Sequence, residues 1–88
     1  MAKISFEDEG WLHYLYWQMQ DRKTLRRINQ LLQSIERDGA LNGLGKPEKL
    51  KHEDGWSRRI NDEHRLVYKI KDENIIAVKS CRGHYGDK

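Results

Sequence analysis

The sequence predicts an α+β fold in which an N-terminal strand and a helical hairpin pack on one face of a mainly antiparallel β-sheet. Two observations support this prediction. Apolar residues recur at helical spacing in the first half of the chain, whereas from about residue 49 onward they alternate with polar residues at the period of a strand. The turns between the later strands are only three or four residues long, which favours antiparallel neighbours. Two helices can then cover one face of the sheet and leave the other open.

The first segment combines a short strand and a helix. Ile4 and Phe6 alternate with polar residues, so residues 3–6 are predicted to form a strand. Three acidic residues follow at 7–9 and favour the first turn of a helix, because the helix dipole attracts negative charge there. This helix is predicted to run to about Gln20. It has an apolar face and an aromatic edge that indicates core packing or an oligomer contact: Leu12, Leu15, Tyr16 and Met19 form the face, and Trp11, Tyr14 and Trp17 form the edge.

A second helix is predicted between Asp21 and Gly39. The Asp21 carboxylate can accept hydrogen bonds from free backbone N–H groups at the helix start, and Gly39 can end the helix in a left-handed conformation. Apolar residues fall at helical spacing between them, namely Leu25, Ile28, Leu31, Leu32 and Ile35. The outer face is basic. We interpret it as a solvated surface, with phosphate contact as the alternative, and it comprises Arg22, Lys23, Arg26 and Arg27.

The second half of the chain is predicted to form the sheet. Residues 39–47 hold three glycines and the only proline, which is typical of a loop. Short strands are predicted at 49–52, 56–60, 64–70 and 75–81, separated by polar turns.

The strand predicted at 64–70 determines which side chains face the helices. Because side chains alternate along a strand, one face carries Leu66, Tyr68 and Ile70, and the other carries Arg65, Val67 and Lys69. The apolar set is expected to lie under the helices. Arg65 should therefore project from the open face on a rigid strand, which is how a group that binds transition-state charge has to be held.

Length, charge and cysteine content limit the possible functions. The 88 residues suffice for one domain, predicted to span residues 1–88. The net charge is +3, and the whole surplus lies in residues 46–88, which hold eleven basic and eight acidic residues, so a polyanion contact is expected there. The single cysteine excludes an internal disulfide and fits a reducing compartment, the cytoplasm. Neither a signal-peptide pattern nor a run of 18 apolar residues is present, so we expect no membrane association.

Several segments together resemble a known family. The segments GKPEKLKH (45–52), WSRRINDEHRLVYKI (56–70) and CRGHY (81–85) resemble the YoeB family of toxins, within the RelE/ParE superfamily, as do YLYWQ (14–18) and RRINQLLQSI (26–35). The resemblance covers nearly the whole chain in order. It implies a RelE-like, microbial ribonuclease-like fold. It also implies the toxin of a type II toxin–antitoxin system, a ribosome-dependent endoribonuclease that cuts mRNA and inhibits translation without a metal or other cofactor.

The resemblance also implies roles for individual residues. RNA carries its own nucleophile, the 2′-hydroxyl, so cleavage needs a base, an acid for the leaving 5′-oxygen and cations for the charged phosphorane. By motif, Glu48 is the general base, Arg65 supports the phosphate charge, His84 is the general acid, and Tyr85 positions the RNA or assists His84. Lys51 and Arg59 are expected to contact phosphate.

Each of these residues also has a simpler interpretation when taken alone. Glu48 could be a loop charge, His84 an inert residue, and Arg65 the surface partner of Glu63. Cys81 and His84 have a Cys-x-x-His spacing, but no second ligand pair accompanies it, so no metal site is predicted. Two departures from the family pattern stand out. Gly83 occupies a position where a larger residue is common, and Gly86-Asp87-Lys88 follow a His–Tyr pair that usually ends such chains.

Partners and competing functions follow from the same resemblance. The family implies a protein antitoxin of the YefM type, and the basic second half suggests that an acidic, partly disordered antitoxin segment folds on the open sheet face. A homodimer is also expected, from the surplus aromatic residues of the first helix together with the dimers among relatives. The alternatives are a ParE-like toxin that blocks DNA gyrase and a non-catalytic RNA-binding module.

Overall fold

The computed structural model describes residues 2–72 and 74–83, which form two helices and five strands. In chain order they are β1 (Lys3–Phe6), α1 (Asp8–Gln20), α2 (Arg22–Asp38), β2 (Glu48–Lys49), β3 (Trp56–Arg59), β4 (Arg65–Asp72) and β5 (Ile75–Ser80). The sheet order is β1-β5-β4-β3-β2, with β1 parallel to β5 and every other pair antiparallel. The predicted α+β class and mainly antiparallel sheet are confirmed.

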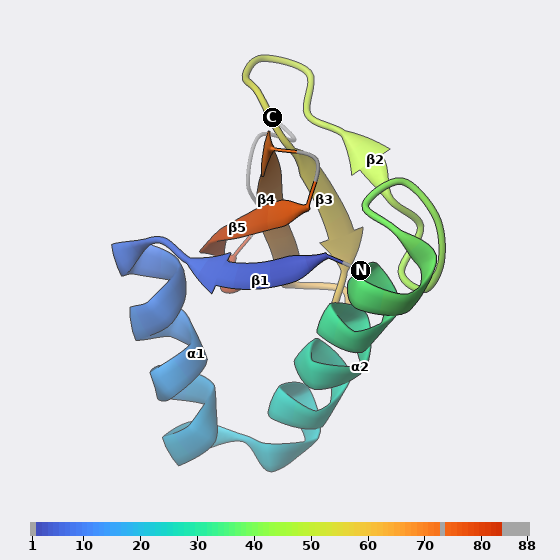
Figure 1. Ribbon diagram of the computed structural model, residues 1–88. Coiled ribbons are helices and arrows are strands. Elements are labelled where there is room, and N and C mark those ends of the chain that lie inside the picture. Colours follow the sequence, from blue (N-terminus) through green and yellow to red (C-terminus); the bar gives the residue numbers. More distant parts are fainter. Residues whose placement is uncertain (1, 73, 84–88) are drawn as a thin grey trace.

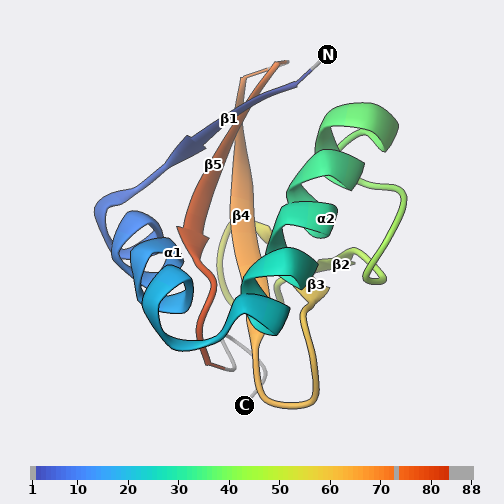
Figure 2. The same cartoon turned by 90° about the horizontal axis from the view of Figure 1, so that it is seen from below.

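Both helices lie against one face of the sheet and enclose the core. They form a V that closes at the turn around Asp21 (Figure 1). Turned by 90°, α1 lies beside β5 and α2 lies beside β4 (Figure 2). Buried residues of both helices and of the central strands meet there: Trp17 from α1, Ile28, Leu31 and Ile35 from α2, Leu66 and Tyr68 from β4, and Ile76 and Val78 from β5.

The ends of α2 are set by the residues that the sequence indicated. Asp21 caps the helix by accepting a hydrogen bond from the backbone N–H of Lys23 at 3.0 Å, and its side chain also accepts one from the Thr24 hydroxyl at 2.7 Å. These bonds hold the pKa of the Asp21 carboxyl below its ordinary value, with the Thr24 hydroxyl as the largest cause. Gly39 ends the helix at a φ of 93°.

The first helix buries a different face from the one its apolar spacing indicates. Leu12 and Met19 are 64 % and 83 % exposed, and Leu15 is exposed as well, whereas Trp17 is buried. Gly10 explains the orientation: a Cβ there would lie 2.4 Å from the carbonyl oxygen of Val78, so α1 approaches β5 along its Gly10 side. The face carrying Leu12, Leu15 and Met19, with the half-exposed Trp11 beside it, points away from the core.

The face of β4 opposite the helices is only partly open. Leu66 and Tyr68 lie under the helices as predicted, but Ile70 is 44 % exposed near the end of the strand. Val67, on the opposite face, is fully buried. The segment after β2 folds back over this face, where Glu53 forms an ion pair with Lys79 of β5 at 2.7 Å.

No helix within the described residues is both long and apolar enough to span a lipid bilayer.

Candidate active site

A tight turn before β2 places Glu48 at the edge of the sheet. Gly45 has a φ of 88°, and a Cβ there would lie 2.7 Å from Leu31, so only glycine fits without a shift. The Gly45 carbonyl accepts a hydrogen bond from the backbone N–H of Arg59 at 2.8 Å. Lys46 follows with a φ of 53°, and Glu48 then pairs with Ser57 of β3. The predicted strand 49–52 is therefore shorter and begins one residue earlier, at Glu48.

Arg65 begins β4 and meets Glu48 across the sheet. Its Nη1 lies 3.4 Å from Oε1 of Glu48, and the side chains are 21 % and 63 % exposed respectively. Both residues line a pocket of about 500 Å³ on the face away from the helices, together with Lys49, Leu50, Lys51 and Ser57. Sequence reasoning singled out Glu48 and Arg65 separately, and the structure brings them together.

The two weaker candidates for phosphate contact are placed differently. Lys51 lines the pocket that contains Glu48 and Arg65. Arg59 is the cross-strand partner of Arg65, so it belongs to the same face, but its guanidinium forms an ion pair with Asp62 in the following turn. Lys51 is therefore the cation better placed to join Arg65 around a bound phosphate.

His84 and Tyr85 lie outside the described residues. Gly83, which immediately precedes His84, accepts a hydrogen bond through its carbonyl from the backbone N–H of Arg65 at 3.1 Å. Consecutive Cα atoms are about 3.8 Å apart. The chain therefore leaves the described region beside the residue that carries the candidate guanidinium.

Cys81 is a structural thiol. It is fully buried, and burial raises the pKa of its thiol to about 12, so the thiol stays protonated at neutral pH. A protonated thiol is neither a nucleophile nor a good metal ligand. Within residues 2–72 and 74–83, no three side chains of the kinds that bind metals are grouped together.

Sequence reasoning missed the residues that complete the pocket. Ser57 faces Glu48 through the pairing of β2 with β3, and it is buried. Leu50 is buried too, and it forms part of the pocket wall. The register of the two strands would have pointed to Ser57, but no sequence signal fixes a register between strands this short.

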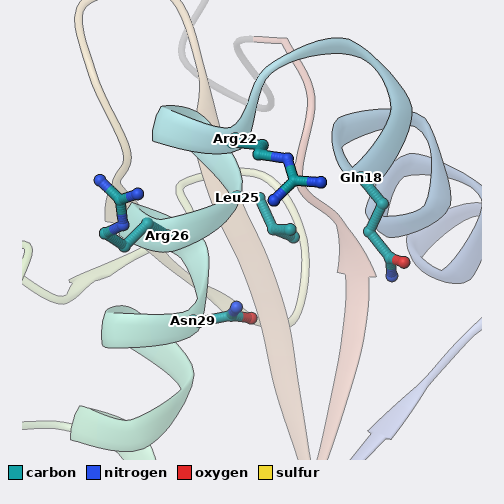
Figure 3. A pocket seen from close by; sticks show the side chains of 5 residues that line it. All are labelled: Gln18, Arg22, Leu25, Arg26 and Asn29. Carbon is teal, nitrogen blue, oxygen red and sulfur yellow. The ribbon is translucent and has the colours of Figure 1, made fainter.

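A second hollow lies between the two helices. It has a volume of about 370 Å³ and is lined by Gln18, Arg22, Leu25, Arg26 and Asn29, with Arg22 reaching across toward Gln18 (Figure 3). None of these lining side chains is a carboxylate, an imidazole or a thiol, so the hollow contains no acid–base pair. The pocket of Glu48 and Arg65, by contrast, places a carboxylate beside a guanidinium.

Comparison with known proteins identifies the family. The sequence model of the YoeB-like toxins of bacterial type II toxin–antitoxin systems matches residues 6–85. The chain belongs to this family. It is 51 % identical to toxin YoeB of Synechocystis over 94 % of this chain and 96 % of that protein. It is 46 % identical to toxin RelK of Mycobacterium tuberculosis, over 97 % of this chain and all of that protein. It is also 44 % identical to toxin YoeB of Escherichia coli, over 94 % of this chain and 99 % of that one.

Solved structures of YoeB toxins have the same fold. The YoeB dimer from Staphylococcus aureus superposes with a TM-score of 0.87 at 50 % identity, covering 96 % of this chain and 98 % of that one. A YoeB–YefM complex from the same organism gives 0.85 at 48 % identity, over 97 % and 99 % of the two chains. A YoeB/ParE toxin from Agrobacterium tumefaciens gives 0.86 at 38 % identity, over 96 % and 100 %. The resemblance to YoeB and the RelE-like fold are both confirmed.

Proposed function

We propose that this YoeB-like toxin is a ribosome-dependent endoribonuclease that cuts mRNA and so inhibits translation, without a metal or other cofactor. One observation carries the proposal: the Glu48 carboxylate and the Arg65 guanidinium stand 3.4 Å apart in a pocket on the face away from the helices. A base and a fixed cation side by side are what in-line attack by a ribose hydroxyl requires.

The proposed reaction assigns a proton transfer or a charge contact to each residue. Glu48 takes the proton from the 2′-hydroxyl, whose oxygen attacks the adjacent phosphorus while the bond to the 5′-oxygen breaks. His84 gives its proton to that leaving oxygen. Arg65 binds the charge that develops on the non-bridging phosphate oxygens, where its planar fork can contact two of them. Tyr85 stacks on an unpaired base or assists His84.

The ion pair between Glu48 and Arg65 fits a resting state. When a phosphate enters the pocket, its oxygens can take over the guanidinium and leave the carboxylate available for the 2′-hydroxyl. Lys51, from the same pocket, and Arg59, from the same sheet face, add positive charge along the RNA backbone. The ribosome supplies substrate positioning, so free RNA should be cut poorly.

Product-end analysis on programmed ribosomes tests the proposal. Purified toxin should cut the message to an upstream fragment ending in a 2′,3′-cyclic phosphate, and a 2′-deoxy nucleotide at the cut site should abolish cleavage. EDTA should spare activity as long as the ribosomes stay intact. Glu48→Gln and His84→Gln should each slow cleavage by roughly 10²–10⁴-fold. Glu36→Gln, the same change at an exposed position of α2, is the matched control and should cut at the wild-type rate.

Two results would contradict the proposal. Products with a 5′-phosphate and a free 3′-hydroxyl would exclude attack by the 2′-hydroxyl and reopen the question of a metal. Intact message together with blocked DNA supercoiling would favour a gyrase-directed toxin.

We also propose a YefM-like antitoxin and a cytoplasmic site of action. A YoeB–YefM complex is known from Staphylococcus aureus. Arg65, Lys69 and Lys79 of the face away from the helices each form an ion pair with a carboxylate of this chain, and an acidic antitoxin segment would have to exchange with those carboxylates to bind there. Co-expression with the neighbouring reading frame should give a stable complex, and a toxin harmless on its own at high expression would contradict this.

The proposed homodimer keeps only Trp11 of the three aromatic residues that the sequence indicated. Trp17 is in the core and Tyr14 is half-buried, so they are not free for a dimer contact. The exposed face of α1 with Trp11, Leu12 and Met19 is the better candidate, and the related toxin from Staphylococcus aureus is a dimer. Sedimentation at micromolar concentration should show a dimer, and a monomer there would count against it.

A further inference from the structure

Side chains, rather than a strand ladder, hold the segment that leads to His84. The last strand ends at Ser80, yet every backbone hydrogen-bonding group of Cys81 and Gly83 has a partner. The Cys81 N–H donates to Nδ1 of His13 at 3.1 Å, and the Cys81 carbonyl accepts from the Trp17 indole at 2.9 Å. These two bonds tie the segment to α1.

The backbone N–H and the carbonyl of Gly83 are both held by two adjacent residues, His64 and Arg65. Its N–H donates to Nδ1 of His64 at 2.8 Å, and its carbonyl accepts from the backbone N–H of Arg65 at 3.1 Å. The φ of Gly83 is 93°, a conformation that glycine adopts readily. A Cβ at this position would meet no atom within 4 Å, so the demand for glycine comes from the backbone and not from a lack of space.

The His64 ring is itself fixed in place. It packs edge-on against the Trp17 indole, with ring centroids 4.9 Å apart. Its backbone is fixed as well, because its carbonyl accepts from the N–H of Ile60 at 3.0 Å and its N–H donates to the Asn61 side chain at 2.9 Å. An Nδ1 that accepts a hydrogen bond carries no proton, so the ring is the neutral tautomer with its proton on Nε2.

We infer that His64 is a positioning residue for RNA cleavage. Its imidazole holds Gly83, the residue that precedes the candidate general acid His84 in the sequence, beside the backbone of Arg65. This inference rests on the proposed function. His64 touches neither the pocket of Glu48 nor the reacting atoms. It acts through Gly83 on the candidate general acid that follows in the sequence, and misplacing a catalytic group by about 1 Å can cost on the order of 10²-fold in rate.

Three substitutions at His64 separate the effect of its hydrogen-bond acceptor from the effect of its aromatic ring. Asn carries its amide oxygen close to the position of Nδ1, whereas Gln carries the same group one bond further out, and both lose the ring. Phe keeps the ring and loses the acceptor. We expect His64→Asn to keep kcat on programmed ribosomes within about fivefold of wild type, and His64→Gln and His64→Phe to lower it on the order of 10²-fold. KM should stay unchanged in all three. His52→Asn and His52→Phe, at an exposed histidine, are the controls.

A second measurement reads the hydrogen bond directly. In protein labelled with ¹⁵N-glycine, the Gly83 amide should exchange slowly with solvent in the wild type and in His64→Asn, and faster in His64→Gln and His64→Phe. The comparison of Asn with Gln stands even if the Phe variant does not fold.

The outcomes distinguish the inference from the proposed function. A wild-type protein that does not cut mRNA overturns the proposed function and with it the positioning role of His64 in cleavage. If the wild type cuts and His64→Gln cuts at the same kcat although its Gly83 amide exchanges faster, only the positioning role is overturned. Loss of kcat in His64→Gln with recovery in His64→Asn supports it.

Discussion

Arg58 and Arg65 lie on neighbouring strands, but their side chains point to opposite faces of the sheet. Arg58 points toward the helices and is completely buried. Its guanidinium donates hydrogen bonds to six oxygens, of Tyr68, Ser34 and the carbonyls of Leu44, Gly39, Ala40 and Asn42. Arg65 points to the other face, is partly exposed, and lies beside the carboxylate of Glu48.

The difference shows how the surroundings decide what an arginine does. Four of the six oxygens that accept from Arg58 are backbone carbonyls of residues 39–44, so most of its hydrogen-bonding capacity goes into holding the loop after α2 against the sheet. The side chain of Arg65 opens onto a pocket with water access, so a phosphate can reach it. The first arginine should therefore determine stability and the second the reaction rate, and each of the following predictions tests that division.

The largest expected effect is on stability, from the buried arginine. Arg58→Met should lower the free energy of unfolding by about 3–5 kcal/mol, because several loop carbonyls lose their donor in a site that water reaches poorly. Urea unfolding followed by tryptophan fluorescence measures this. Arg59→Met is the matched control: Arg59 is half-exposed and paired with Asp62, so its loss should cost at most about 1 kcal/mol. Equal unfolding midpoints for the two variants would show that Arg58 is not the structural centre of the loop.

The second effect is on the reaction rate, from the exposed arginine. Arg65→Ala should slow cleavage of ribosome-bound mRNA on the order of 10²–10³-fold, since the developing phosphate charge loses its partner. Arg65→Lys should recover only part of the lost rate, because a lysine ammonium cannot contact two phosphate oxygens as the planar guanidinium does. Single-turnover cleavage gives the rates, and urea unfolding of the same samples should show little change. If Arg65→Ala lost as much unfolding free energy as Arg58→Met, the assignment of Arg58 to stability and Arg65 to the reaction rate would be wrong.

The sequence predicts where the helices and strands lie better than it predicts which of their faces lie against the core. The comparison of Arg58 with Arg65 depends on those faces. Helical spacing, the Asp21 cap and the Gly39 stop fixed α2 closely, and the alternation from Leu66 to Tyr68 predicted which face of β4 lies under the helices. In α1, by contrast, the apolar residues lie on a face that the core does not use, because the absence of a side chain at Gly10 outweighs their hydrophobicity in setting the approach to β5.

The sequence predicted which residues belong to the candidate site, but it did not predict how they lie relative to one another. The motifs around Glu48 and Arg65 indicated both residues, yet their meeting depends on the two-residue strand β2 and its register with β3. Arg58 and Arg59 are adjacent in the sequence, and periodicity alone does not say which of them is buried. Register and close backbone approach are properties of the assembled sheet, so local pattern cannot determine them.

A smaller effect concerns the phenol that binds Arg58. Burial raises the pKa of Tyr68, whose hydroxyl donates to the Ala40 carbonyl at 2.6 Å and accepts from Arg58 at 3.0 Å. A raised folded pKa means that this stabilisation is complete below about pH 10, where unfolded tyrosine titrates, and is lost as the pH rises toward the folded value. Tyr68→Phe should cost about 1–2 kcal/mol at pH 8.

The dependence of the unfolding free energy on alkaline pH gives a sharper test of the buried Tyr68 phenol. The difference in unfolding free energy between wild type and Tyr68→Phe should narrow between pH 8 and pH 11, because only the wild type has this phenol to ionise when it unfolds. Contributions of the other tyrosines and of Cys81 are common to both proteins and cancel in the difference. A constant difference across this range would mean that Tyr68 ionises equally easily in the folded protein, contrary to its burial against Arg58.

The smallest expected effect separates binding from chemistry within the pocket itself. Lys51 lines the pocket with Arg65, but its long exposed chain suits a phosphate contact in the ground state better than a fixed contact in the transition state. Lys51→Ala should raise KM for programmed ribosomes by about 3–10-fold and leave kcat within about twofold, since one such contact is worth about 1 kcal/mol. Lys3→Ala is the matched control, because Lys3 lies on β1, at the opposite edge of the sheet from β2. The increase in KM should shrink as salt is added, because a phosphate contact is weakened by counterions. If Lys51→Ala instead lowered kcat at unchanged KM, Lys51 would belong with Arg65 among the groups that stabilise the transition state, and the pocket would hold two catalytic cations.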